Sequence, residues 1–234
     1  MDSSIARDTA QSAANAHQKR ALRRTLLATR ESLAERDALD AALAHRLADE
    51  IARCAPRCIG FYWPIQGEFD ARGVVGHWLA EAATASIATG ATGTANAANA
   101  VRLAALPVVT APATPLVFHR WTPDTLMTEG HYRIPVPKDT EVLVPDLLLV
   151  PCVGFTRTGL RLGYGGGFYD RTLHSLSPVP RTLGIAYDAL EVAELTAEAH
   201  DLALDAIVTE SATYRGPDAP PASHPADRPH GTTR

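Results

Sequence analysis

Hydrophobic positions follow two different patterns along the chain. Near the N-terminus they recur every three or four residues, which is typical of helices with one buried side. This spacing predicts helices over 19–32, with Leu22, Leu26, Leu27 and Leu33, and over 35–53, with Leu39, Leu43, Leu47 and Ile51. A third helix is predicted over 74–83. Short β-prone apolar runs predict strands at 58–63, 101–109, 116–121, 147–150, 182–187 and 204–208.

The alternation of helices and strands predicts an α/β fold. We expect a layered single domain with a mainly parallel central sheet flanked by helices, Rossmann-like in arrangement, over residues 17–215. The polar segment 1–16 and the Pro-, Asp- and His-rich segment 216–234 are predicted to be disordered tails. Segment 84–99, rich in Ala, Thr, Gly and Asn, is predicted to be a low-complexity loop insertion. Ligands of such sheets gather at the carboxyl ends of the strands.

Composition and net charge limit the kinds of partner that the sequence predicts. The chain has 234 residues, of which 46% are hydrophobic and 21% are charged, as in ordinary globular proteins. A net charge of −4 gives no general attraction to nucleic acid or to an anionic membrane. No apolar run approaches the ~20 residues of a membrane helix, and no secretory leader is recognisable. We therefore expect a cytoplasmic monomer or weak homodimer with small-molecule partners. Cys54, Cys58 and Cys152 are predicted to be buried free thiols.

The most informative stretch is a glycine-rich loop within 161–170, which reads R-L-G-Y-G-G-G-F-Y-D. It follows the apolar run 146–151, and residues 171–176 can continue as a helix. Glycines at such a turn let the backbone present its N–H groups to an anion, and a helix start adds the positive end of its dipole. The glycines of the loop are Gly163, Gly165, Gly166 and Gly167.

Two charged residues flank these glycines and favour a nucleotide site. Arg161 supplies a fixed positive charge, and Asp170 supplies a hard oxygen suited to magnesium. The stretch is neither a Walker loop, which ends in Gly-Lys-Ser/Thr, nor the dinucleotide pattern, because Phe168 stands where the third glycine belongs. The alternative interpretation is a tight turn whose glycines serve only backbone geometry.

Three further groups supply candidate ligand contacts, each with a structural alternative. Four cations, Lys19, Arg20, Arg23 and Arg24, share one side of the first predicted helix, where they bind phosphate or form a solvated basic face. After the first strand, Trp63 offers a ring for stacking and Glu68 offers a carboxylate for an amino-pyrimidine edge, or the two belong to an ordinary exposed turn. His200-Asp201 is an ordinary loop dipeptide unless Asp201 joins Asp170 at magnesium.

These segments, in this order and spacing from residue 19 to about residue 210, resemble the 5-formyltetrahydrofolate cyclo-ligase family. The most specific likeness is 159–170, G-L-R-L-G-Y-G-G-G-F-Y-D; the others are K-R-A-L-R at 19–23, G-E at 67–68, P-C-V-G-F at 151–155, G-I-A-Y at 184–187, and H-D at 200–201 with D-A-I-V-T-E at 205–210. The resemblance implies an ATP- and magnesium-dependent enzyme. Such an enzyme would convert 5-formyltetrahydrofolate to 5,10-methenyltetrahydrofolate, with release of ADP and phosphate, by phosphorylating the formyl oxygen and closing the ring.

The resemblance also implies roles for individual residues. ATP would contact Lys19, Arg20, Ala21, Leu22, Arg23, Arg161, Leu162, Gly163, Tyr164, Gly165, Gly166, Gly167, Phe168 and Tyr169. The folate would lie against Trp63, Glu68, Tyr164, Gly165, Gly166, Gly167 and Phe168. Lys19 and Arg161 would be catalytic, and Asp170 and Asp201 would bind Mg²⁺. A noncatalytic nucleotide- or folate-binding regulator on the same scaffold and a sugar-phosphate isomerase-like enzyme remain as alternatives.

Overall fold

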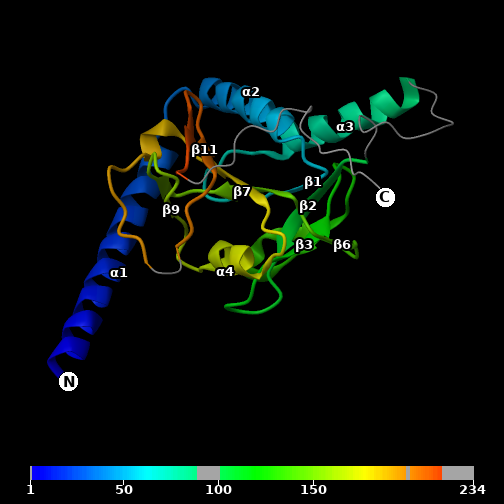
Figure 1. Cartoon of the computed structure of the whole chain (residues 1–234). Coiled ribbons are helices and arrows are strands. Elements are labelled where there is room, and N and C mark those ends of the chain that lie inside the picture. Colours follow the sequence, from blue (N-terminus) through cyan, green and yellow to red (C-terminus); the bar gives the residue numbers. More distant parts are fainter. Residues whose placement is uncertain (1, 89–100, 199–200, 218–234) are drawn as a thin grey trace, which may run out of the picture.

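An eight-stranded sheet forms the centre of the fold (Figure 1). The structure, a computed structural model, describes residues 2–88, 101–198 and 201–217. The strand order is β12-β11-β10-β7-β1-β2-β3-β6. The strands are β1 (Cys58–Gly60), β2 (Leu103–Val108), β3 (Val117–Arg120), β6 (Val142–Leu143), β7 (Leu147–Pro151), β10 (Arg181–Ile185), β11 (Ala206–Val208) and β12 (Thr213–Arg215).

The central part of the sheet is parallel, and both of its margins are antiparallel. β1 pairs in parallel with β2 and β7, and β10 pairs in parallel with β7 and β11. β12, β3 and β6 pair antiparallel at the two sides. Leu147–Val150 of β7 are fully buried, as expected of a central strand covered on both faces. The predicted α/β fold with a mainly parallel sheet is confirmed.

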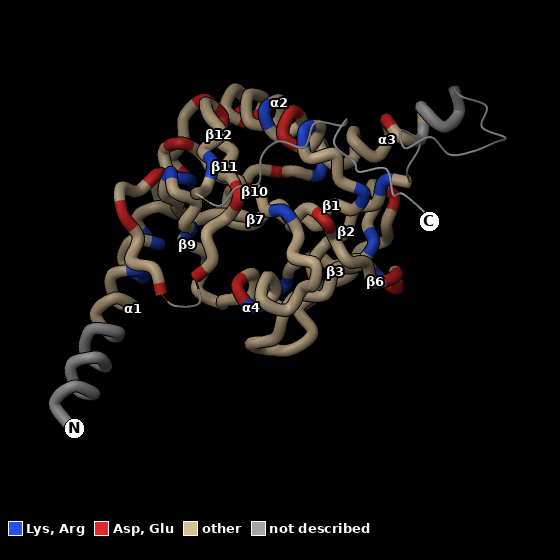
Figure 2. The backbone as a smooth tube through the Cα atoms, viewed as in Figure 1, with Lys and Arg blue, Asp and Glu red and all other residues tan. Residues whose placement is uncertain are grey.

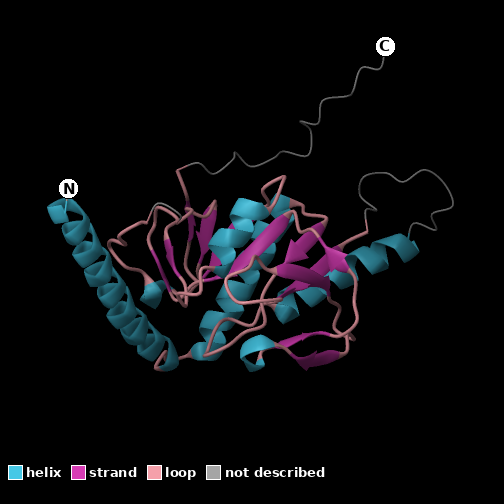
Figure 3. Cartoon of the chain, turned by 90° about the horizontal axis from the view of Figure 1, so that it is seen from below, coloured by secondary structure: helices cyan, strands magenta, loops and turns pink. Residues whose placement is uncertain are grey.

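Helices cover both faces of the sheet. α2 (Arg36–Cys54) and α3 (Arg72–Ala88) contact each other and pack on β11 and β2, respectively, whereas α4 (Phe168–Ser175) lies on the opposite side (Figures 1 and 3). The long helix α1 (Asp2–Glu31) runs along one end of the sheet and contacts η3 (Asp188–Leu190). None of the described helices combines the length and apolar character needed to cross a bilayer.

Two small hairpins stand outside the main sheet. β4 (Met127–Glu129) pairs with β5 (Pro135–Pro137) around η2 (His131–Arg133), and β8 (Gly154–Phe155) pairs with β9 (Arg161–Leu162). The sequence predicted that the glycine loop follows the apolar strand β7 directly. In the structure the second hairpin, formed by β8 and β9, lies between β7 and the loop. Strands of two residues carry no alternation of side chains, so the sequence pattern did not reveal them.

Two predicted boundaries differ from the structure. Residues 2–16, expected as a disordered tail, belong to helix α1, because 2–31 contains neither Gly nor Pro and is rich in Ala and Arg. The expected loop insertion 84–99 begins too early, since α3 extends to Ala88; residues 89–100 lie outside the described part. Most of the predicted tail 216–234 also lies outside it. All three cysteines are free, with Cys58 and Cys152 buried and Cys54 half-buried.

Charged residues of both signs are interspersed along the described chain (Figure 2).

The carboxyl ends of the parallel strands meet at one edge of the sheet. The Trp63–Glu68 turn follows β1, the β8–β9 hairpin and the glycine loop follow β7, and buried Tyr187 follows β10. The topology therefore brings these three segments to the same edge.

Candidate active site

The glycine loop, residues 163–167, links β9 to helix α4. Gly165 has a φ of 93° and Gly167, which immediately precedes α4, has a φ of 63°. Residues with a side chain rarely adopt either value, so glycine suits both positions. A Cβ at Gly165 would lie 3.3 Å from the guanidinium carbon of Arg23, so the loop and this cation are in close contact. The α4 N-terminus supplies the helix dipole expected at an anion site.

Two of the four N-terminal cations are half-buried, and two are exposed. Arg23 donates from Nε to the carbonyl oxygen of Gly163 at 2.7 Å, and burial lowers the pKa of Arg23. Lys19 is one helical turn away and pairs with Glu198 at 2.8 Å. Arg20 and Arg24 are exposed, whereas Lys19 and Arg23 are half-buried. Positions four apart lie on one face of a helix, whereas a neighbouring position is rotated by about 100°.

Arg161 is the most deeply buried cation of the predicted set, with 6% of its side chain exposed. Its Nη2 donates to Asp170 Oδ1 at 2.5 Å, and its Nη1 donates to the carbonyl oxygen of Leu202 at 2.9 Å. Arg161 therefore joins α4 to the segment that carries Asp201. Asp201 in turn pairs with Lys19 at 3.2 Å. The predicted catalytic cations and metal ligands therefore form two ion pairs, which are linked by the hydrogen bond from Arg161 to the carbonyl oxygen of Leu202, the residue after Asp201.

The two predicted magnesium ligands, Asp170 and Asp201, suit a metal site that is completed by phosphate oxygens and waters. Within the described residues there is no group of three or more His, Cys, Asp or Glu that could hold a metal ion. Asp170 pairs with Arg161 and Asp201 pairs with Lys19, so each carboxylate has a cationic partner of its own. Mg²⁺ is commonly bound by one or two carboxylates, with phosphate oxygens and waters completing its shell. This donor set suits magnesium that arrives with a phosphate. His200, adjacent to Asp201, lies outside the described residues.

Glu68 is buried and hydrogen-bonded, so the alternative of an exposed turn carboxylate is wrong. It is 8% exposed; its Oε2 accepts from the Ile65 N–H at 2.9 Å, and its Oε1 accepts from the Tyr164 hydroxyl at 2.8 Å. Burial raises the pKa of Glu68, although both hydrogen bonds and nearby Arg30 oppose the rise. Burial and then the Glu68 charge raise the pKa of Tyr164 well above its ordinary value. The 63–68 turn and the glycine loop are thus joined directly.

Arg30 is the functional-site residue that the sequence interpretation missed. It is 1% exposed and donates to the carbonyl oxygen of Gln66 at 3.0 Å and to the hydroxyl oxygen of Tyr164 at 2.6 Å. A longer contact of 3.4 Å reaches the Cys152 carbonyl oxygen at the end of β7. One buried guanidinium therefore holds three segments together. Its position, seven residues after Arg23 on the same face of α1, is the one sequence signal that pointed to it.

Aromatic rings surround this centre. Trp63 is half-buried, with the Arg72 guanidinium 4.2 Å from its ring centroid. Phe168 packs edge-on against exposed Tyr132, with ring centroids 6.2 Å apart. Burial raises the pKa of Tyr169 well above its ordinary value, so its hydroxyl stays protonated. Of the remaining residues in the predicted ATP-binding set, Leu162 is buried, Ala21 and Leu22 are half-buried, and Gly166 lies against the Phe168 ring.

Chemically, this edge of the sheet offers an anion site beside a buried carboxylate. Arg23, Lys19, Arg161 and the loop amides supply positive charge and N–H donors. Glu68 supplies an acceptor for a polar ring edge, and Trp63 and Phe168 supply apolar surface. Such a set suits two ligands side by side, one carrying phosphates and one carrying a flat heterocycle.

Comparison with known proteins agrees with this geometry. The profile of the 5-formyltetrahydrofolate cyclo-ligase family matches residues 15–210. Proteins named 5-formyltetrahydrofolate cyclo-ligase from Haemophilus influenzae and Escherichia coli are 40% identical over 97 residues and 36% identical over 105 residues. These matches cover 38% and 42% of this chain and 51% and 58% of the relatives, so the chain spans about half the length of the curated relatives it matches.

A solved structure extends the likeness to nearly the whole fold. The NMR structure of Aquifex aeolicus 5,10-methenyltetrahydrofolate synthetase has a TM-score of 0.65 and 24% sequence identity, covering 89% of this chain and 98% of that one. At this identity the similarity establishes the fold alone. With the family profile matching residues 15–210, the chain belongs to the 5-formyltetrahydrofolate cyclo-ligase family.

Proposed function

We propose that this protein converts 5-formyltetrahydrofolate and ATP to 5,10-methenyltetrahydrofolate, ADP and phosphate, in the presence of Mg²⁺. The observation that carries the proposal is the hydrogen bond from Arg23 to Gly163, at 2.7 Å. It joins segments 140 residues apart and gives the glycine loop a cation from α1. A loop of backbone N–H groups with a fixed cation is suited to a polyphosphate.

In the proposed reaction, the γ-phosphoryl group of ATP is transferred to the oxygen of the formyl group on N5 of the folate. The N10 nitrogen then attacks the formyl carbon, the C–O bond breaks, phosphate leaves, and N10 loses its proton. Phosphoryl transfer depends on alignment and on charge stabilisation rather than on a protein nucleophile. Lys19, Arg23, Arg161 and the loop amides fill those needs.

The predicted residue roles carry over to this proposal. The ATP-contacting set is 19–23 and 161–169, with Lys19 and Arg161 nearest the transferred group. Asp170 and Asp201 would hold magnesium together with phosphate oxygens, and the ion would neutralise part of the phosphate charge. Arg161 keeps Asp170 in place through its 2.5 Å hydrogen bond.

The folate side of the proposal rests on Glu68. Its carboxylate accepts from the amino-pyrimidine edge of the pterin, while Trp63 and Phe168 cover the ring. The hydrogen bond from Tyr164 fixes Glu68 Oε1 at the glycine loop. The formyl group of a pterin bound to Glu68 then lies near the phosphate donor. A cytoplasmic location and a monomeric or weakly dimeric state stay predictions.

Purified protein with ATP and 5-formyltetrahydrofolate tests the proposal directly. We expect the absorbance of the methenyl product to rise together with ADP, and to stop rising when EDTA removes Mg²⁺. Asp170→Asn keeps the shape of the side chain but removes its charge. We expect this change to slow the reaction about 100-fold, the usual effect of losing one electrostatic partner.

The matched control is Asp124→Asn in an exposed turn, which leaves the rate unchanged. A wild-type rate in Asp170→Asn would contradict the metal assignment. ATP and folate binding without any methenyl product would instead support the noncatalytic alternative.

A further inference from the structure

Arg171, near the start of α4, folds back onto the second half of the glycine loop. Its Nη2 donates to the carbonyl oxygen of Gly166 at 2.5 Å, and its guanidinium carbon lies 5.2 Å from the centroid of the Phe168 ring. A Cβ at Gly167 would lie only 2.7 Å from Arg171 Nη1. The missing side chain at Gly167 therefore makes room for the guanidinium, in addition to permitting the φ of 63°.

Two arginines thus contact the loop from different helices. Arg23 reaches the first half of the loop from α1 and donates to the carbonyl oxygen of Gly163, whereas Arg171 reaches the second half from α4. A carbonyl oxygen repels an anion, and each guanidinium occupies one such oxygen. Both contacts therefore favour a loop surface on which N–H groups and positive charge predominate.

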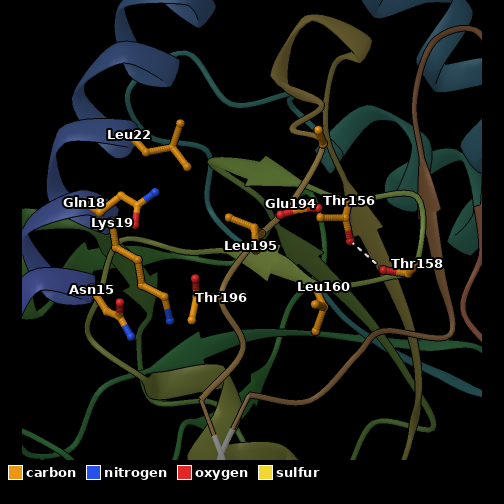
Figure 4. A pocket seen from close by; sticks show the side chains of 11 residues that line it. Asn15, Gln18, Lys19, Leu22, Thr156, Thr158, Leu160, Glu194, Leu195 and Thr196 are labelled. Carbon is orange, nitrogen blue, oxygen red and sulfur yellow. Dashed lines mark hydrogen bonds between the residues drawn. The ribbon is translucent and has the colours of Figure 1, made fainter. Parts of the chain in front are cut away.

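Arg171 differs from the predicted catalytic cations in its charge balance. Lys19 borders a cavity of about 360 Å³ beside α1 (Figure 4), and its ammonium pairs with two carboxylates. Arg161 pairs with Asp170. Among the ion pairs formed within the described residues, none includes Arg171. Its charge is therefore not balanced by a described carboxylate, and it adds net attraction for a polyphosphate.

One nitrogen of Arg171 also lacks an acceptor. Its Nε is buried and has no hydrogen-bond partner in the part of the chain that the structure describes. A buried N–H without an acceptor is unfavourable, and such groups are nearly always paired in proteins. A phosphate group offers several acceptor oxygens, and guanidinium groups bind it through parallel N–H donors. The unpaired donor and the unbalanced charge indicate the same class of ligand, a phosphate.

The position of Arg171 corresponds to the meeting point of the two proposed substrates. In the proposed function, the glycine loop binds the phosphates of ATP and Phe168 covers the folate ring. The transferred phosphoryl group passes from one substrate to the other, so it must lie between them. Arg171 contacts both Gly166 and Phe168, and its guanidinium therefore lies at this junction.

We propose that Arg171 is a further catalytic residue, whose guanidinium binds the γ-phosphoryl group of ATP during its transfer. The inference rests on the proposed function. In the transfer step, the bond from the γ-phosphorus to the β,γ-bridging oxygen breaks while the bond to the formyl oxygen forms, and ADP leaves with the electron pair. Arg171 donates hydrogen bonds to the oxygens of the transferred group, neither gives nor takes a proton, and stabilises their charge.

Calorimetric titration of the full chain with ATP and with ADP, in the absence of folate, tests this assignment, because the two nucleotides differ by the γ-phosphate. Arg171→Met removes the guanidinium and keeps much of the side-chain volume. We expect it to raise the Kd of ATP about tenfold and the Kd of ADP less than threefold. In the methenyl assay we expect kcat to fall about 100-fold.

Arg57→Met is the matched control, because it removes the same charge at the opposite end of the sheet. Arg57 directly precedes β1, and 79% of its side chain is exposed. We expect this variant to leave both affinities and kcat unchanged. Arg171→Lys guards against misfolding of Arg171→Met, since it keeps a charge but loses the planar pair of donors. We expect its kcat to fall roughly tenfold and its Kd for ADP to stay unchanged.

Two results would overturn the inference. One is an unchanged kcat in folded Arg171→Met and Arg171→Lys. The other is equal weakening of ATP and ADP, which would mean that Arg171 only shapes the loop. Wild-type protein that forms no methenyl product would remove the proposed reaction. The comparison of ATP with ADP would then still decide whether Arg171 binds the γ-phosphate.

Discussion

Replacing the buried guanidinium of Arg30 tests how the site is held together. Arg30→Met keeps most of the side-chain volume but removes the donors to Gln66, Tyr164 and Cys152. A hydrogen bond to a charged group contributes about 1.5–3 kcal/mol. The two shorter bonds, at 2.6 and 3.0 Å, therefore predict a loss of about 3–5 kcal/mol, allowing for solvent that replaces part of the contact at Tyr164.

Urea unfolding at equilibrium, followed by circular dichroism, measures this loss. Arg24→Met on the same helix is the control, because Arg24 is exposed, and we expect it to change stability by less than about 0.5 kcal/mol. If the free energy of unfolding falls equally steeply with urea concentration in the two variants, both unfold from a comparable native state. A loss of 1 kcal/mol or less in Arg30→Met would refute the assigned role.

The pH dependence of the same measurement tests the coupling of Arg30 to Glu68. Burial raises the pKa of Glu68 in the folded protein, and the Arg30 charge opposes that rise. Without Arg30, the folded protein favours protonated Glu68 still more strongly. A carboxyl whose pKa is raised on folding contributes stability at pH values below its unfolded pKa, and this contribution disappears as pH rises through the folded pKa. The penalty of Arg30→Met is therefore larger at pH 7 than near pH 4.5; a penalty independent of pH would refute the coupling.

Three other substitutions probe the loop, the nucleotide and the folate. Gly165→Ala places a Cβ against Arg23 at a φ of 93°, so we expect thermal unfolding to show destabilisation of about 1–3 kcal/mol. Gly73→Ala is the control, because a Cβ at this position in α3 meets open space, and we expect it to stabilise the protein by roughly 0.5–1 kcal/mol. Lys19→Met should lower kcat/KM for ATP about 100-fold in the methenyl assay; a change below threefold would contradict its role. Glu68→Gln should raise KM for 5-formyltetrahydrofolate at least tenfold and KM for ATP less than threefold, and equal effects on both would exclude a specific folate contact.

The sequence predicted the fold well where burial is periodic. Helix α2 was expected over 35–53 and is found at Arg36–Cys54, because its apolar side is specified at every turn. The central strands were also predicted, because a strand that is buried on both faces is a continuous apolar run in the sequence. The N-terminal half of α1 was missed because it has no clear apolar face, so only intrinsic propensity signalled a helix there.

The site was predicted less completely than the fold, because charge alone does not specify burial. Arg30 was overlooked, since arginine is usually exposed and no local pattern shows that three acceptors from distant segments will surround it. Glu68 was identified as a candidate, but its burial depends on Tyr164, 96 residues away. Arg20 was grouped with Lys19 and Arg23 because of their helical spacing and the family resemblance, and the structure leaves it exposed.

The placement of charge on α1 explains how a glycine loop without a Walker lysine can serve as a polyphosphate site. A loop of backbone N–H groups neutralises little of a triphosphate charge by itself, so the site requires cations from another segment. Lys19, Arg23 and Arg30 occupy one face of α1 and contact, respectively, the Asp201 segment, the glycine loop and the Gln66 turn. Because one rigid helix carries all three, a shift of α1 would move the cations relative to both proposed substrates at once. Changes on this face should therefore affect ATP and folate together.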